Sequence, residues 1–167
     1  MISTWLVRLW LCVLLSGLMA CSSRLPLPAQ APLLQGVELP LQLHLRYQEA
    51  ELSGDALLVI QREEDGLRFS LFDALGVPKA RQILKQGRWY ADGLLPPNPQ
   101  ARQWFAALLF ALTPDQQLLQ QYPDATQTAQ QRDLSNGWQV QYSAERHWQI
   151  IFNSQHRLAI EQMEWQP

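Results

Sequence analysis

Hydrophobic and polar residues alternate over several short stretches of the chain, a pattern typical of β-strands with one buried face. In the clearest case, Leu41, Leu43 and Leu45 are separated by Gln42 and His44. The strands predicted in this way are 41–47, 56–62, 67–71, 79–85, 89–90, 138–142, 148–152 and 158–165. Their spacing and the turn residues between them predict an antiparallel meander.

One helix is predicted between the two groups of strands. Asn98 is a residue type that caps helices, and Pro99 suits the first helical position. The helix is expected to run to about Leu112. Its body, 104–112, consists of nine apolar residues with no polar face. We therefore expect the helix to be surrounded by other parts of the protein or to face an apolar environment.

Two further signals follow this helix. Thr113 with Gln116 matches a capping box and predicts a second short helix that ends near Tyr122. Asn136-Gly137 is the strongest hairpin signal in the chain. The order strands, helices, strands predicts an α+β fold: a curved, incompletely closed antiparallel β-barrel with a short helical lid or plug.

The first 20 residues have the layout of a secretory signal, with one positive charge at Arg8 and an apolar run at 9–15. That run is too short to span a membrane as a helix. The segment ends in Leu18-Met19-Ala20-Cys21, which resembles a bacterial lipobox, whose cysteine is lipidated. The alternative is an ordinary signal with a chance cysteine. The predicted organisation is a signal peptide at 1–20, a lipidated N-terminus and proline-rich tether at 21–40, and a lipid-binding domain at 41–167.

The cysteines and prolines support this organisation. Cys12 lies in the segment to be removed and Cys21 would carry the lipid, so the mature domain has no cysteine for a disulfide. Four prolines in residues 24–40 predict an extended tether that holds the domain off the membrane. Ser22 follows the cysteine where lipoproteins retained in the inner membrane usually carry Asp, which by resemblance predicts the outer membrane.

The charge balance excludes a nucleic-acid binder. The chain has 13 Lys and Arg against 15 Asp and Glu, a net charge of −2, whereas binding to phosphates requires a basic surface. Removal of residues 1–20 takes away Arg8 and leaves 12 basic against 15 acidic residues, or −3. Attraction to anionic lipid headgroups is therefore not expected, and the anchor is expected to be lipid.

Catalytic motifs are missing from the sequence. It contains no GxSxG elbow, no Gly-rich phosphate loop and no HExxH helix. His44, His147 and His156 lie far apart, and no second ligand lies at metal-binding spacing. The acidic run Glu63-Glu64-Asp65 is typical of a solvated turn. The chain is predicted to be no enzyme and to use no cofactor or metal.

The apolar residues admit two interpretations. They either fill a core, or line a cavity between the apolar helix and the concave face of the sheet, which would suit acyl chains. The cavity-lining candidates are Leu43, Leu45, Leu58, Ile60, Phe69, Leu71, Trp104, Leu108, Leu109, Trp138, Val140 and Ile150.

Four features of the sequence belong together: Leu75-Gly76 after a predicted strand, Arg102-Gln103-Trp104 at the start of the predicted helix, the hairpin at 136–142, and Trp165. Over roughly residues 41–165, they resemble the LolB-like outer-membrane lipoproteins of the LolA/LolB superfamily. Leu75-Gly76 is similar to the family's Pro-Leu-Gly loop, and Arg102-Gln103-Trp104 opens the helix as in the family. The resemblance implies an unclosed barrel that receives acylated lipoproteins from a LolA-like periplasmic carrier, with Leu75 as a membrane-contacting residue. Alternatively, Leu75 folds back onto the sheet edge.

The departures from the family point to a specialised relative. Ala74 replaces the loop's proline, and residues 87–97 leave no room for the family's further helix. The smaller lid favours another acyl or polyene-like lipid as cargo. The first hypothesis is therefore an outer-membrane lipoprotein, facing the periplasm from the inner leaflet, that binds acyl chains and helps to insert them. The alternatives are an interaction subunit of an envelope assembly or of a lipid or polyene export pathway, with a filled core, and a lipid-processing enzyme.

Overall fold

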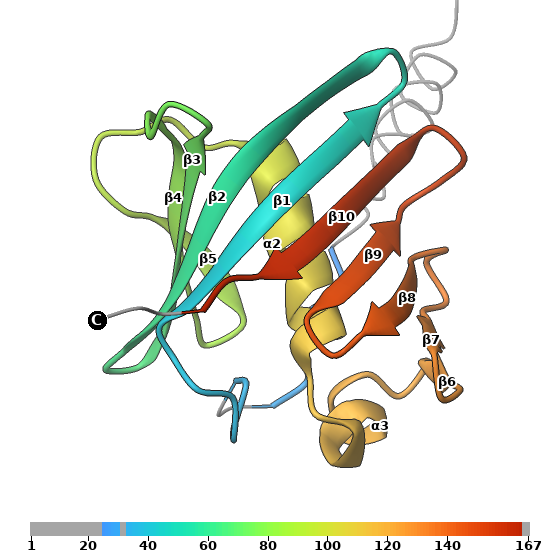
Figure 1. Ribbon diagram of the computed structural model, residues 1–167. Coiled ribbons are helices and arrows are strands. Elements are labelled where there is room, and N and C mark those ends of the chain that lie inside the picture. Colours follow the sequence, from blue (N-terminus) through green and yellow to red (C-terminus); the bar gives the residue numbers. More distant parts are fainter. Residues whose placement is uncertain (1–24, 31–32, 165–167) are drawn as a thin grey trace, which may run out of the picture.

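A computed structural model describes residues 25–30 and 33–164, which form an open antiparallel sheet curved around one long helix (Figure 1). The strands are β1 (Leu41–Glu49), β2 (Leu52–Glu63), β3 (Gly66–Asp73), β4 (Pro78–Lys85), β5 (Arg88–Ala91), β6 (Thr126–Gln127), β7 (Gln131–Asp133), β8 (Gln139–Ala144), β9 (His147–Ile151) and β10 (His156–Gln162). The helical elements are α2 (Pro99–Leu112), the 3₁₀ turn η1 (Asp115–Gln117) and α3 (Leu118–Gln121). The predicted signal peptide, Cys21 and Trp165 lie outside the described residues. Across the described ranges, no helix is both long and apolar enough to cross a membrane.

The sheet has ten strands in the order β5-β4-β3-β2-β1-β10-β9-β8-β7-β6 within the described residues. β5 and β6 are its edges and do not pair with each other, so the barrel is not closed. At the centre of the sheet, Leu45 on β1 lies opposite Ala56 on β2 and Ile160 on β10. All three side chains are buried, because alternation places every second residue on the concave face. The predicted open, curved antiparallel sheet with a helical plug is confirmed at this level.

Every strand expected from alternation is present, with shifts of a few residues at the ends. The strand expected from Trp138 begins one residue later, at Gln139. Two further strands, β6 and β7, were not predicted. They have two and three residues and are mostly polar, so they carry no alternation that a sequence pattern could reveal.

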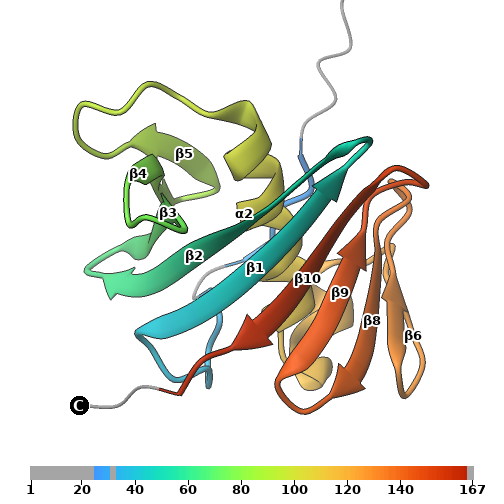
Figure 2. The same cartoon turned by 45° about the horizontal axis from the view of Figure 1, so that its top comes forward.

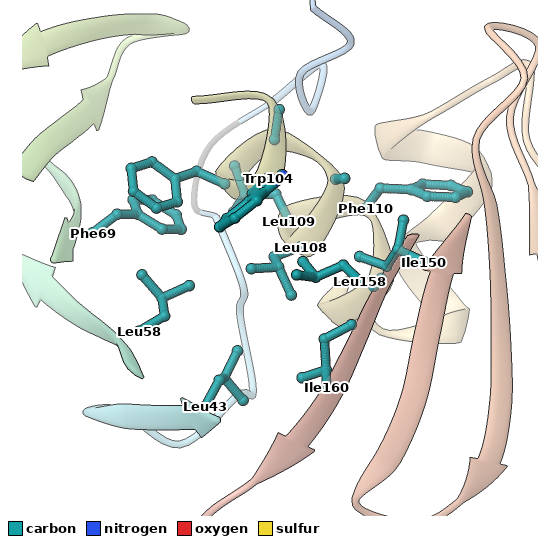
Figure 3. Packing of buried hydrophobic residues seen from close by; sticks show 14 of the residues in the cluster. Leu43, Leu58, Phe69, Trp104, Leu108, Leu109, Phe110, Ile150, Leu158 and Ile160 are labelled. Carbon is teal, nitrogen blue, oxygen red and sulfur yellow. The ribbon is translucent and has the colours of Figure 1, made fainter. Parts of the chain in front are cut away.

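Helix α2 lies against the concave side of the sheet (Figure 2). Its side chains meet those of strands from both halves of the sheet (Figure 3). Nine of its 14 residues are buried, which confirms the prediction of a helix wrapped by protein. The helix begins as predicted: the side chain of Asn98 accepts a hydrogen bond from the backbone N–H of Ala101 at 3.0 Å, and Pro99 is the first helical residue.

The capping box predicted at Thr113 is wrong. The Thr113 hydroxyl donates a hydrogen bond backwards to the Leu109 carbonyl at 2.7 Å, so it serves the end of α2. The following turn η1 has Pro114 at its N-cap and no side-chain cap. The second short helical segment does form, as η1 and α3, and it ends beside Tyr122 as predicted.

Residues 25–30 and 33–40, here called the strap, carry no helix or strand, as their prolines predict. The strap nevertheless lies on the domain instead of extending away from it, contrary to the tether prediction. Leu34 is buried in the core, and the Arg62 guanidinium donates to the carbonyls of Leu33 and Leu34. Further along, the N–H of Ala29 donates to the Gln121 carbonyl in α3 at 3.0 Å. Alternation and proline content gave no sign of these long-range contacts.

Candidate functional site

The turn between β3 and β4 presents Leu75 to solvent, with 89% of the residue exposed. Leu75 therefore does not fold back onto the sheet edge. The Asp73 carboxylate accepts the backbone N–H groups of Leu75 (3.0 Å) and Val77 (2.9 Å), and the Asp73 carbonyl accepts the N–H of Gly76 (2.9 Å). Gly76 has a φ of +79°, which glycine adopts without strain. The tip is thus an ordered turn with a leucine at its apex.

The carboxylate that organises this turn is held in its charged form. The hydrogen bond from the Val77 N–H, helped by Lys79 and by the Leu75 N–H, keeps the pKa of Asp73 below its ordinary value although partial burial opposes this. The Lys79 ammonium lies 3.2 Å from the second carboxylate oxygen. Asp73 is therefore ionised at neutral pH, and the turn keeps its shape.

Other apolar side chains are exposed at the same end of the sheet. The turns β1–β2 and β3–β4 lie at one end because successive strands are antiparallel. Leu52, at the start of β2, is 65% exposed and Val77 is 49% exposed. Leu94, fully exposed, lies on the loop that leads from β5 to the start of α2. This end of the molecule therefore offers several leucines to an apolar environment.

A hollow of about 210 Å³, here called the mouth, opens at this end. Leu52 and Asp73 lie on its wall, together with the start of α2. Deeper in the wall, the rings of Tyr47 and Trp104 are tilted against each other with centroids 5.2 Å apart, beside Leu71. The mouth thus leads from the exposed leucines to an aromatic and aliphatic floor.

All twelve residues predicted to line a cavity belong to one buried cluster, and none is more than 6% exposed. Figure 3 shows several of them, from Leu43 on the sheet to Leu108 on α2, pointing toward one another. Leu71 and Trp104 also form part of the mouth. The structure therefore brings the twelve together around α2 and opens two of them to the mouth.

A larger hollow of about 590 Å³ lies at the opposite end, between the strap and the turns β2–β3 and β4–β5. Its apolar surface includes Leu27 and Leu33 of the strap and Leu67 and Leu84 of the sheet. None of the twelve predicted residues is on its wall. Sequence reasoning missed this hollow because it depends on where the strap packs.

Arg132 on β7 is a second feature that the sequence did not reveal. It is only 4% exposed, and its guanidinium donates to the carbonyls of Phe110, Ala111 and Thr113 at 2.7–3.1 Å. These belong to the end of α2, where carbonyls lack helical partners and the helix dipole favours a cation. The same guanidinium pairs with Asp115, and this contact, with help from Gln127, lowers the pKa of the Asp115 carboxyl.

Tyr142 on β8 completes this cluster. Its hydroxyl donates to the Ala111 carbonyl at 2.7 Å, and its ring lies 5.3 Å from the Arg132 guanidinium carbon. Burial raises the pKa of Tyr142 to about 12, so the phenol keeps its proton and remains a donor at neutral pH. The cluster closes the end of α2 that lies away from the mouth.

The three histidines lie on the surface. His44 is 2.9 Å from Asp55, His147 is 3.5 Å from Glu161, and His156 bonds to Asn153. Among residues 25–30 and 33–164, no group of three His, Cys, Asp or Glu side chains is arranged to hold a metal ion.

No protein-family model matches the sequence, and no curated protein matches it significantly.

Proposed function

We propose that this chain is an outer-membrane lipoprotein that faces the periplasm, binds an acyl chain at the mouth and helps to insert lipidated cargo into the membrane. The observation that carries the proposal is Leu75, an exposed leucine at the apex of an ordered turn beside a hollow whose wall includes Tyr47, Leu71 and Trp104, with charged residues such as Glu49 and Lys79 also on that wall. Cys21 would provide the lipid anchor. The resemblance of the Leu75-Gly76 loop and of the Arg102-Gln103-Trp104 helix start to LolB-like proteins supports the same function.

Physical chemistry supports a membrane contact at Leu75. Transfer of a leucine side chain from water into lipid stabilises the contact by about 1.5–3 kcal/mol. The hydrogen bonds that the Asp73 carboxylate accepts from the Leu75 and Val77 N–H groups already fix the turn, so little conformational entropy is lost on insertion. Leu52, Val77 and Leu94 would enlarge the apolar contact, because they are exposed at the same end.

The size of the mouth bears on the cargo. Its volume of about 210 Å³ is below the roughly 300–1,000 Å³ of most small-molecule sites. In the proposed function the mouth therefore takes the end of one acyl or polyene-like chain, not a complete lipoprotein anchor. Tyr47, Leu71 and Trp104 would contact that chain. A LolA-like periplasmic carrier is the expected donor, and acylated lipoprotein the first cargo to test.

A second candidate function is an interaction subunit of an envelope assembly. The observation in its favour is the packed interior, since the predicted cavity-lining residues are at most 6% exposed. In that case the exposed leucines contact a protein partner and the mouth binds no lipid. Uptake of an acylated probe separates the two functions.

The test uses Leu75→Glu in a chain that also carries Cys21→Ala. A fluorescent palmitoylated peptide is the probe, and vesicles of phosphatidylethanolamine and phosphatidylglycerol are the acceptor. We expect Leu75→Glu to bind the peptide as tightly as the parent and to deliver it to vesicles at least about tenfold more slowly, because the charged tip no longer enters lipid.

The matched control is Leu119→Glu, since Leu119 is 64% exposed on α3, away from the mouth. It should deliver the peptide at the parental rate. Unchanged delivery by Leu75→Glu would refute the membrane role of Leu75, and a parent chain that takes up no peptide would favour the interaction subunit.

A further inference from the structure

A row of glutamines crosses the outer face of β7, β8 and β9. The amide of Gln149 donates to Gln141 at 2.6 Å, Gln141 donates to Gln139 at 2.7 Å, and Gln139 donates to Asp133 at 2.9 Å. Gln131 donates to both Asp133 carboxylate oxygens at 2.9 Å. Four amides are thus held in fixed orientations by hydrogen bonds that end at one carboxylate: Gln131 and Gln139 donate to Asp133 directly, and Gln141 and Gln149 are linked to it through Gln139.

This row borders a groove of about 650 Å³ on the same outer face. The polar side chains on its wall are uncharged amides and hydroxyls, with His147 at one edge: Thr128, Gln130, Gln131, Gln141, Ser143 and Gln149. Within the described part of the chain, its wall includes no Asp, Glu, Lys or Arg, although 17% of the sequence is charged. The groove is therefore hydrogen-bonding but neutral.

The face on which the groove lies follows from the strand alternation. Val140 and Ile150 point into the core, so Gln141 and Gln149 beside them point outward. The mouth is built from β1 to β4 and the start of α2, and shares no residue with the groove. The two places can therefore be occupied independently.

We propose that this groove binds an uncharged glycan strand. A glutamine amide both donates and accepts hydrogen bonds. The hydroxyl and acetamido groups of sugars also donate and accept, so the two kinds of group complement each other. The hydrogen bonds within the row of glutamines fix the amides before binding, so little side-chain conformational entropy is lost when a ligand binds. A neutral wall gives no advantage to an anion, a cation or a lipid headgroup, because those ligands need a charge partner.

The test titrates the Cys21→Ala chain with two uncharged oligosaccharides, triacetylchitotriose and maltotriose, and follows binding by calorimetry. The double variant Gln141→Met/Gln149→Met keeps side-chain length and removes both amides. It should weaken binding at least about fivefold, since each hydrogen bond contributes a factor of roughly two to ten. The control Gln61→Met alters an exposed glutamine on β2 outside the groove and should bind as the parent does.

Circular dichroism first establishes that the variants fold. If the double variant is unfolded, Gln149→Glu is tested in its place. The glutamate has nearly the same shape as the glutamine but adds a charge to the neutral groove, so this variant should also lose glycan binding. Binding that is equal in the parent and the folded variant overturns the proposal. So does the absence of binding by both oligosaccharides, or the binding of an uncharged peptide in their place. Leu75→Glu should leave glycan binding unchanged, which separates this site from the proposed lipid function.

Discussion

Arg132 holds the end of a helix with one side chain. A buried guanidinium would be costly without partners, but three carbonyls, the helix dipole and Asp115 face it. The sequence could not identify this role, because Arg132 stands among polar residues in a short stretch and its partners lie about 20 positions away. Leu75, in contrast, was identified by the resemblance of its loop to that of a known family, although the sequence left open whether it is exposed or folds back; the turn around Asp73 exposes it.

The replacement Arg132→Leu should lower the free energy of unfolding by about 3–5 kcal/mol, because it leaves three buried carbonyls without their donor, at about 1–3 kcal/mol each. Urea denaturation followed by tryptophan fluorescence measures the change. Arg146→Leu is the control: Arg146 pairs with Glu164 in an exposed salt bridge, whose loss costs less than about 1 kcal/mol. Equal losses in both variants would show that the buried hydrogen bonds of Arg132 contribute no more to stability than an exposed salt bridge does.

Among the elements, α2 was the most predictable and the small strands the least. Asn98, Pro99 and the apolar body from 104 to 112 are local signals, and they fix the start, length and burial of α2. Alternation likewise located β1 to β4, because each of these strands has a row of buried side chains on one face. Strand β7 pairs with the edge of β8, and β6 pairs in turn with β7; such pairing leaves little trace in two or three residues.

The start of α2 gives a prediction at this scale. Asn98→Ala should lower the free energy of unfolding by about 1 kcal/mol, because the N–H of Ala101 loses its side-chain acceptor. The melting temperature from circular dichroism reports the change. Asn98→Asp keeps an acceptor at the same place and should melt as the parent does. If Asp is as destabilising as Ala, the cap does not account for the loss.

Over the whole molecule, the strap is the part that sequence reasoning placed least well. Several prolines close together disfavour a helix or strand, but they do not determine whether a segment extends into solvent or packs on a domain. The strap carries apolar residues at Leu25, Leu27, Leu33 and Leu34, and all of them pack against the core cluster. The hollow of about 590 Å³ between the strap and the sheet could not be predicted for the same reason.

Leu34→Ala tests whether the strap is part of the cooperative fold. Leu34 is 4% exposed, so truncation should reduce the free energy of unfolding by about 2–5 kcal/mol. Leu119→Ala, at an exposed position, should change it by less than about 0.5 kcal/mol. Urea denaturation compares the two variants. A loss at Leu34 as small as at Leu119 would mean that the strap only rests on the surface.

The position of the strap determines how the molecule responds to a pulling force. If the chain hangs from a membrane by Cys21, tension enters the described part at Leu25, and the first bonds it loads are those of the strap, such as Ala29 to Gln121. The sheet is loaded only afterwards, at β1, which is held on both sides by β2 and β10. Tension would therefore detach the strap and open the hollow between the strap and the sheet, while the sheet stays intact.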